Sequence, residues 1–241
     1  MRLNDRVALV TGGGRGIGRA IARAFAGEGA NVAVCARTEG QVKDAAAEIE
    51  ALGVRSVAIP GDVSDEDDVA RIVAETRRVL GPIDVLVNNA GIFRTRLALE
   101  TDPAEFDAIM RTNVRGPFLM TRAVAPEMLE RAGGVILNIG SLAGKKGYVA
   151  QSAYCASKHA LLGFSRALAM ELEGSGVRVS VLSPGGVDTE LIVAERPDVD
   201  RATWMEPEDI ARLAVLLVTM PDKMAVDEIA VRRTASSPVF F

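Results

Sequence analysis

The chain has few of the residues that build metal centres and disulfide frameworks. Its 241 residues include two cysteines, Cys35 and Cys155, and one histidine, His159. A single histidine excludes a histidine-rich metal site, and the two cysteines do not have metal-ligand spacing. Two isolated cysteines in a chain of this length indicate buried thiols in a reducing compartment. We therefore expect no metal in the functional site.

The sequence also lacks a basic surplus and a long apolar run. Its formal net charge is −4, whereas a nucleic-acid-binding surface is normally basic. No apolar stretch approaches the roughly 20 residues needed to cross a bilayer. The apolar run Val7–Val10 is too short for the core of a signal peptide. We expect a cytoplasmic protein with neither a nucleic-acid partner nor a membrane partner.

Apolar residues are abundant, at 49% of the chain, and they fall into short strands that alternate with amphipathic helices. This content supports a sizeable core, and the length suits one domain. Such alternation predicts the α/β class, with a doubly wound parallel sheet and helices on both faces. The expected strands are 7–11, 31–36, 54–59, 83–87, 134–139, 177–182 and 226–231, and the expected helices are 17–26, 39–52, 65–80, 103–131, 153–166 and 207–220. Gly116 and Pro117 predict a bend in the long helix.

A glycine-rich turn separates the first predicted strand from the first helix. Residues 11–18 read Thr-Gly-Gly-Gly-Arg-Gly-Ile-Gly. Glycines let a backbone approach a pyrophosphate closely, and the N-terminus of the following helix favours its negative charge. Strand, turn and helix together predict a dinucleotide site.

The end of the second predicted strand bears on which dinucleotide binds. An NAD site usually carries an acidic residue there, which binds the ribose hydroxyls. Here Ala36 takes that place and Arg37 follows it, while Arg15 lies inside the glycine turn. Two guanidinium groups suit the 2′-phosphate of NADP, so we favour NADP(H) over NAD(H). The alternative is that both arginines are solvated surface residues.

Other polar residues follow the ends of later strands. Asp62 follows the third strand and either bonds an adenine amino group or caps the next helix. Asn89 follows the fourth strand, and a glycine turn at 184–189 follows the sixth. The carboxyl ends of parallel strands meet at one edge of a sheet, where ligands bind. The polar, irregular segment 190–206 is a candidate substrate lid.

Tyr154 and Lys158 lie four residues apart on a predicted helix, so they share one face. A nearby ammonium lowers the pKa of a phenol, which suits a tyrosine that exchanges protons near neutral pH. The spacing alone is also that of an ordinary solvated face. Ser141 follows a buried strand, where an ordinary turn serine is the alternative. Asn113 lies among apolar residues, and a structural role there is as plausible as a catalytic one.

Together these residues closely resemble the short-chain dehydrogenase/reductase family. The resemblance covers residues 3 to about 190. It rests on Thr11-Gly12-x-x-x-Gly16-x-Gly18, Asp62-Val63, Asn88-Asn89-Ala90-Gly91, Asn113, Ser141, Tyr154-x-x-x-Lys158 and Pro184-Gly185 with Thr189. It implies one NAD(P)-binding Rossmann-type domain over residues 1–241, with a catalytic tetrad of Asn113, Ser141, Tyr154 and Lys158. The implied cofactor contacts are Gly12, Arg15, Gly16, Ile17, Gly18, Arg37, Asp62, Val63, Asn89, Gly91, Tyr154, Lys158, Pro184, Gly185, Val187 and Thr189.

The resemblance also implies a reaction, namely hydride transfer between NADP(H) and a carbonyl or alcohol. Tyr154 would exchange the proton, and Ser141 would orient the substrate oxygen. Lys158 would lower the pKa of Tyr154 and hold the nicotinamide ribose. Asn113, through its backbone, would hold a water that links Lys158 to solvent. The most familiar relatives of this kind reduce 3-oxoacyl thioesters, but a small ketone, a sugar or a steroid stays open as the small-molecule substrate.

The end of the chain departs from the family pattern. Residues 227–234 lack the glycines that many members carry after the last helix, and the segment between Thr189 and Pro207 is short. The family sets substrate choice and subunit contacts in these regions. The resemblance implies a homotetramer or homodimer, and the apolar face of 106–119 fits either a subunit contact or core burial. The apolar end, Pro238–Phe241, either frays or docks on a neighbouring subunit.

Two other functions are compatible with the same motifs. One is a non-catalytic NADP-binding redox sensor that keeps the fold. The other is a lyase or isomerase that uses the tyrosine for proton chemistry without net redox. A reductase oxidises NADPH when it turns over a carbonyl compound, whereas the sensor and the lyase or isomerase do not.

Overall fold

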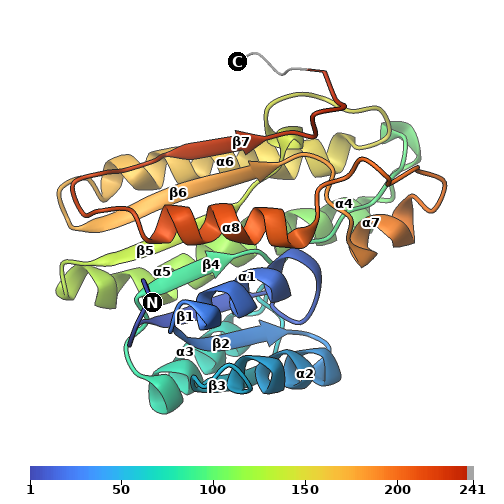
Figure 1. The fold of residues 1–241 in the computed structure, drawn as a ribbon. Helices are drawn as coiled ribbons and strands as arrows, with labels where there is room; N and C mark the ends of the chain where they lie inside the picture. Colours follow the sequence, from blue (N-terminus) through green and yellow to red (C-terminus); the bar gives the residue numbers. More distant parts are fainter. Residues whose placement is uncertain (238–241) are drawn as a thin grey trace.

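The structure is a computed structural model that describes residues 1–237, and the apolar end at 238–241 lies outside that range. Seven parallel strands form one sheet in the order β3-β2-β1-β4-β5-β6-β7 (Figure 1). The predicted doubly wound sheet is confirmed. The strands are β1 (Val7–Thr11), β2 (Asn31–Ala36), β3 (Ser56–Pro60), β4 (Val85–Asn88), β5 (Gly134–Ile139), β6 (Val177–Pro184) and β7 (Glu228–Val231).

Helices cover both faces of the sheet. One face carries α1 (Gly16–Gly27), α2 (Glu39–Glu50) and α8 (Pro207–Val218), and the other carries α3 (Glu66–Leu80), α5 (Gly116–Glu130) and α6 (Ser152–Glu171). Each face of the sheet has its own hydrophobic core, and successive residues of β1 alternate between the two. Ala8 and Val10 lie in the core on the α1 side, and Val7 and Leu9 lie in the core on the α3 side. This two-sided burial explains why the central strands are continuous apolar runs.

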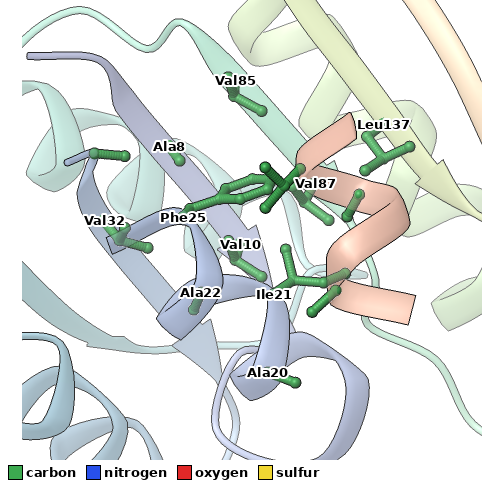
Figure 2. Close-up of a cluster of buried hydrophobic side chains, with 14 of the residues drawn as sticks. Ala8, Val10, Ala20, Ile21, Ala22, Phe25, Val32, Val85, Val87 and Leu137 are labelled. Atoms are coloured by element: carbon green, nitrogen blue, oxygen red, sulfur yellow. The ribbon is translucent and has the colours of Figure 1, made fainter. Parts of the chain in front are cut away.

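The packing of α1 fixes the glycine turn that precedes it. Figure 2 shows Ile21 and Phe25 of α1 directed toward Val10 and Val87 of the sheet. Phe25 is fully buried, and truncating a buried phenylalanine costs about 3–5 kcal/mol. Since α1 is anchored over β1 and β4, its N-terminus is held above the carboxyl ends of these strands.

The helix predicted over 103–131 is helical without a break from Pro103 to Glu130, but a π-helical turn interrupts its α-helical pattern. The segment forms α4 (Pro103–Met110), a π-helical turn at Arg111–Arg115, and α5. The predicted bend at Gly116 and Pro117 falls where α5 begins. Asn113 lies in the π-turn, and its side chain bonds to the backbone of Ile92. An inserted π-turn re-aims side chains and is frequent at functional sites.

Other local predictions also need correction. Residues 190–206 are not wholly irregular, because they contain α7 (Glu190–Glu195). Three strands, β3, β4 and β7, each begin two residues later than predicted. Asp62 does not cap α3: Asp65 is the cap and accepts a hydrogen bond from the Asp68 N–H, at 2.9 Å. Asp62 instead accepts hydrogen bonds from the Ser64 N–H and hydroxyl.

The remaining gross features concern cysteines and hydropathy. Both cysteines are buried and unpaired, as predicted, and burial raises the pKa of Cys35 to about 12. Within residues 1–237, no helix is both long and apolar enough to cross a membrane.

Candidate functional site

A cleft follows the carboxyl ends of the strands, at the place where the strand order reverses between β1 and β4. Ligands bind at such switch points in doubly wound sheets. Every predicted site residue except Gly18 and Asn113 lines this cleft. The lining residues are Gly12, Gly14, Arg15, Gly16, Ile17, Ala36, Arg37, Thr38, Gln41, Gly61, Asp62, Val63, Asn89, Ala90, Gly91, Ile92, Thr112, Ile139, Gly140, Ser141, Tyr154, Lys158, Pro184, Gly185, Val187, Thr189, Glu190, Leu191 and Ile192.

The glycine turn is locked to the end of β4 by hydrogen bonds. Gly12 and Gly16 have φ of 63° and 51°, a region that glycine adopts without the cost a Cβ imposes. The Asn89 amide donates to the carbonyls of Thr11 and Gly12, at 2.9 and 3.1 Å. The Thr11 hydroxyl accepts from the N–H groups of Asn89 and Ala90, at 3.0 Å each. The motif after β4 therefore shapes the turn after β1.

Gly18 supports the turn from behind instead of lining the cleft. It is buried, and an added Cβ would collide with the Gly12 carbonyl oxygen and the Asn89 amide. We expect Gly18→Ala to cost about 1–3 kcal/mol of unfolding free energy and to weaken dinucleotide binding. Urea unfolding and the fluorescence of bound NADPH measure the two effects.

A matched control is Gly163→Ala, in the middle of α6. Nothing lies within 4 Å of a Cβ built there, so this variant should gain about 0.8–1 kcal/mol of stability from helix propensity. Wild-type stability and binding in Gly18→Ala would contradict the close approach of α1 to the turn.

Two cations stand at one end of the cleft without a partner. Arg15 and Arg37 are exposed and line the cleft, and neither forms an ion pair within residues 1–237. The first turn of α1 holds no acidic residue, and no side chain caps it. Unpaired guanidiniums and free helix N–H groups form a setting for phosphates. This chemistry fits the two phosphate-bearing parts of NADP.

Tyr154 and Lys158 stand at the other end, one turn apart on α6. The ammonium of Lys158 lies 5.8 Å from the centre of the Tyr154 ring and donates to the Ile139 carbonyl, at 2.8 Å. Lys158 is 6% exposed, and this burial lowers its pKa to about 8. The side chain is therefore a buried donor fixed between α6 and the end of β5.

The predicted depression of the Tyr154 pKa is wrong for the chain by itself. Desolvation raises the pKa of Tyr154 from 10.0 to about 12, and a hydrogen bond with Ser141 opposes the rise. The Lys158 ammonium is turned toward a backbone carbonyl, so burial outweighs its influence on the phenol. At neutral pH the phenol keeps its proton.

The Asn113 side chain lies behind the cleft, where it is hydrogen-bonded to two other segments. Its Oδ1 accepts from the Ile92 N–H at 2.8 Å, and its Nδ2 donates to the Ile92 carbonyl and the Ser157 hydroxyl, at 3.0 Å each. The Ser157 hydroxyl donates in turn to the Tyr154 carbonyl at 2.7 Å. Asn113 thus connects the loop after β4 to the first turn of α6.

Ser141 begins a short turn between β5 and α6. Its hydroxyl accepts from the Ala143 N–H at 3.1 Å, and residues Leu142–Gly144 form a 3-10 helix.

The Phe93 ring packs edge-on against the Tyr154 ring, with centroids 4.9 Å apart and planes at 82°. Phe93 is 3% exposed, so it fixes the orientation of the tyrosine ring.

Part of the predicted lid borders the cleft and is tethered. Leu191 and Ile192 of α7 line the cleft. Glu195, at the end of α7, accepts from the Arg94 guanidinium at 3.0 Å and from the Thr95 N–H at 3.2 Å. Two contacts therefore hold α7 against the loop after β4.

Sequence reasoning missed several residues of this site. Ile92 and Phe93 carry no chemical signature, because an apolar residue in a loop looks the same whether it lines a ligand or the core. Leu191 and Ile192, by contrast, fall inside the predicted lid at 190–206. Thr38 and Gln41 follow Arg37 closely, and their position after a strand end was the signal that could have found them.

Comparisons with known proteins agree with this geometry. A family model described as short chain dehydrogenase matches residues 6–200. A short chain dehydrogenase of Pseudocercospora fijiensis is 42% identical over 193 residues, which is 79% of this chain and 62% of that protein. The ketoacyl reductase HetN of Nostoc sp. is 37% identical over 88% of this chain and 75% of its own length. A crystal structure of a metagenomic short-chain oxidoreductase in complex with NADP has a TM-score of 0.85 and 38% identity, covering 97% of this chain and 100% of that one.

Proposed function

Because the chain belongs to the short-chain dehydrogenase/reductase family, an oxidoreductase family, we propose that it transfers hydride between NADP(H) and a carbonyl or alcohol substrate. One observation carries the proposal. A single cleft has Ser141, Tyr154 and Lys158 on its β5 side, and on its β2 side Arg15 and Arg37, which form no ion pair within residues 1–237. This arrangement suits a molecule with a reactive ring at one end and a phosphate at the other.

The cofactor, when bound, supplies the hydride for the carbonyl carbon. Arg37 and Arg15 would hold its 2′-phosphate, and the turn at Gly12–Gly16 would hold its pyrophosphate. Lys158 would donate to the nicotinamide ribose. The metagenomic relative in complex with NADP supports this choice over NAD.

Tyr154 is proposed as the proton donor to the substrate oxygen. A pKa of about 12 keeps the phenol protonated at neutral pH, which is the form that donates a proton during carbonyl reduction. Ser141, which lines the cleft together with Tyr154, would donate to the same oxygen and orient it. The result is an alcohol, with the proton from Tyr154 replaced from solvent.

The substrate is proposed to be an apolar ketone or 3-oxoacyl compound. Ile92, Leu191 and Ile192 line the cleft around its polar groups, and apolar walls with few polar groups favour apolar ligands. The relative named as a ketoacyl reductase supports the 3-oxoacyl class. The test is loss of NADPH absorbance against a panel of ketones and 3-oxoacyl thioesters, with NADH in parallel. Tight NADPH binding without turnover of any carbonyl would overturn the proposal in favour of a sensor.

The pH profiles should differ between the two directions. Oxidation needs a deprotonated Tyr154, and below its pKa the deprotonated fraction grows about tenfold per pH unit, so the oxidation rate should rise between about pH 7 and about pH 10. Reduction needs the protonated phenol and the Lys158 ammonium, whose pKa is about 8, so the reduction rate should be flat below that value and decline above it. Initial rates in both directions measure this, and an oxidation rate that falls with rising pH would argue against Tyr154 as the base.

A homotetramer or homodimer in the cytoplasm is also proposed. Phe106 and Phe118 are 41% and 46% exposed on α4 and α5. Phe118 packs edge-on with Phe164 of α6 at 6.3 Å. Exposed aromatic side chains on adjacent helices are typical of a subunit contact. Light scattering of the purified chain measures the assembly, and a monomer at all concentrations would reject it.

A further inference from the structure

A largely buried ion pair lies close to the Ser141 turn, and the proposed reaction does not use it. The Lys145 ammonium lies 2.8 Å from an Oε atom of Glu228, and the two side chains are only 8% and 14% exposed. Lys145 follows the 3-10 turn after Ser141, whereas Glu228 is the first residue of β7. The pair joins the loop before α6 to the end strand of the sheet.

The carboxylate of Glu228 is held from three directions. Besides Lys145, it accepts from the Ser183 hydroxyl of β6 at 3.0 Å and from the Arg166 guanidinium of α6 at 3.4 Å. Ser183 is 1% exposed, whereas the Arg166 side chain is 63% exposed. The contacts to Lys145 and Ser183 are therefore the shielded ones, and screening by water leaves them stronger than the contact to Arg166.

A buried ion pair is weak evidence for stability, because removing two charges from water offsets much of their attraction. Its established use is to fix one arrangement against others. The neighbouring β7 is short, and within residues 1–237 it pairs with β6 alone, at the edge of the sheet. The position of the pair therefore matters more than its energy.

The turn that the pair anchors is held together by its own backbone hydrogen bonds. The Gly144 N–H donates to the Ser141 carbonyl at 2.9 Å, and the Lys145 N–H donates to the Leu142 carbonyl at 3.0 Å. On its other side the turn touches α6 directly, since a Cβ on Gly144 would lie 2.7 Å from the Lys158 carbonyl oxygen. A shift of Lys145 is thus transmitted to Ser141 and to the backbone of Lys158.

We propose that Lys145 and Glu228 are positioning residues that hold the Ser141 turn against α6, so that the Ser141 hydroxyl stays aligned with Tyr154. This inference rests on the proposed reductase function for its effect on turnover. Neither side chain lines the cleft. Their effect should therefore fall on kcat and on the mobility of the turn, and not on dinucleotide binding.

The test compares Lys145→Met, Glu228→Gln and the double variant with wild type. We expect each single change to lower kcat by about tenfold to a hundredfold, because displacements of about 1 Å in a catalytic group have such effects. The Kd for NADPH should stay within about twofold of wild type, since the phosphate-binding residues lie at the other end of the cleft. The double variant should lose no more than the worse single one, because both changes break the same contact. Amide hydrogen exchange of residues 141–146 should accelerate in all three.

Arg166→Met is the matched control, since it removes the exposed contact to the same carboxylate and should leave kcat and exchange near wild type. Should Lys145→Met fail to fold, Lys145→Arg keeps the charge but lengthens the side chain, and it should lower kcat without changing Tm. Unchanged kcat and exchange in folded variants, or equal losses in Arg166→Met, would overturn the positioning role. If the wild type turns over no carbonyl, the proposed function fails, and the exchange measurement still decides whether the pair holds the turn.

Discussion

Tyr154→Phe should lower kcat for carbonyl reduction by about 10²–10⁴-fold, the usual contribution of a general acid. The ring and its edge-on contact with Phe93 are kept, so only the transferable proton is lost. NADPH should bind as in wild type, because the phosphate-binding part of the cleft is unchanged. Stopped-flow loss of NADPH absorbance, with a saturating ketone, measures the effect.

The chain offers a matched control in its only other tyrosine, Tyr148. Tyr148 is 38% exposed, and the Lys146 ammonium lies 5.0 Å from the centre of its ring. Tyr148→Phe should keep near wild-type turnover. Turnover retained in Tyr154→Phe would remove the tyrosine from its assigned role and direct attention to Ser141 as the donor.

Arg37→Asp should reverse the preference for NADPH over NADH. A hydrogen bond to a charged group contributes about 1.5–3 kcal/mol, so losing it weakens NADPH binding roughly tenfold to a hundredfold. The introduced carboxylate repels the 2′-phosphate and can accept from ribose hydroxyls, which favours NADH. The ratio of kcat/KM for the two cofactors measures the change.

The matched control for Arg37→Asp is Arg122→Asp, which makes the same change of charge at an exposed residue of α5 outside the cleft. It controls for the effect of net charge on an anionic ligand, and its cofactor ratio should match wild type. An equal ratio in Arg37→Asp and wild type would mean that Arg37 is a solvated surface residue and that Arg15 alone contacts the phosphate.

Motif residues at strand ends were predictable because the geometry of a parallel sheet is regular. Once strands are identified, Gly12, Arg37 and Asn89 must meet at one edge, whatever the details of the helices between them. The structure brings them into one cleft.

Features that depend on contacts distant in sequence were not predictable. Asn113 lies in a π-helical turn and bonds to Ile92, and nothing in the local pattern specifies that bond. The pKa of Tyr154 depends on how many neighbours exclude water, so a rule based on its spacing from Lys158 gave the wrong direction. Lys145 and Glu228 pair across 83 positions (228 − 145), and each alone resembles a surface charge.

The tether between Glu195 and the loop after β4 should make turnover depend on ionic strength. The Arg94–Glu195 pair is partly exposed, with side chains at 42% and 20%, and dissolved salt screens such pairs over about 8–10 Å. The hydrogen bond from the Thr95 N–H is not weakened to the same degree. If release of the product limits turnover, added potassium chloride should therefore increase kcat modestly, up to the point where the phosphate contacts of the cofactor are also screened.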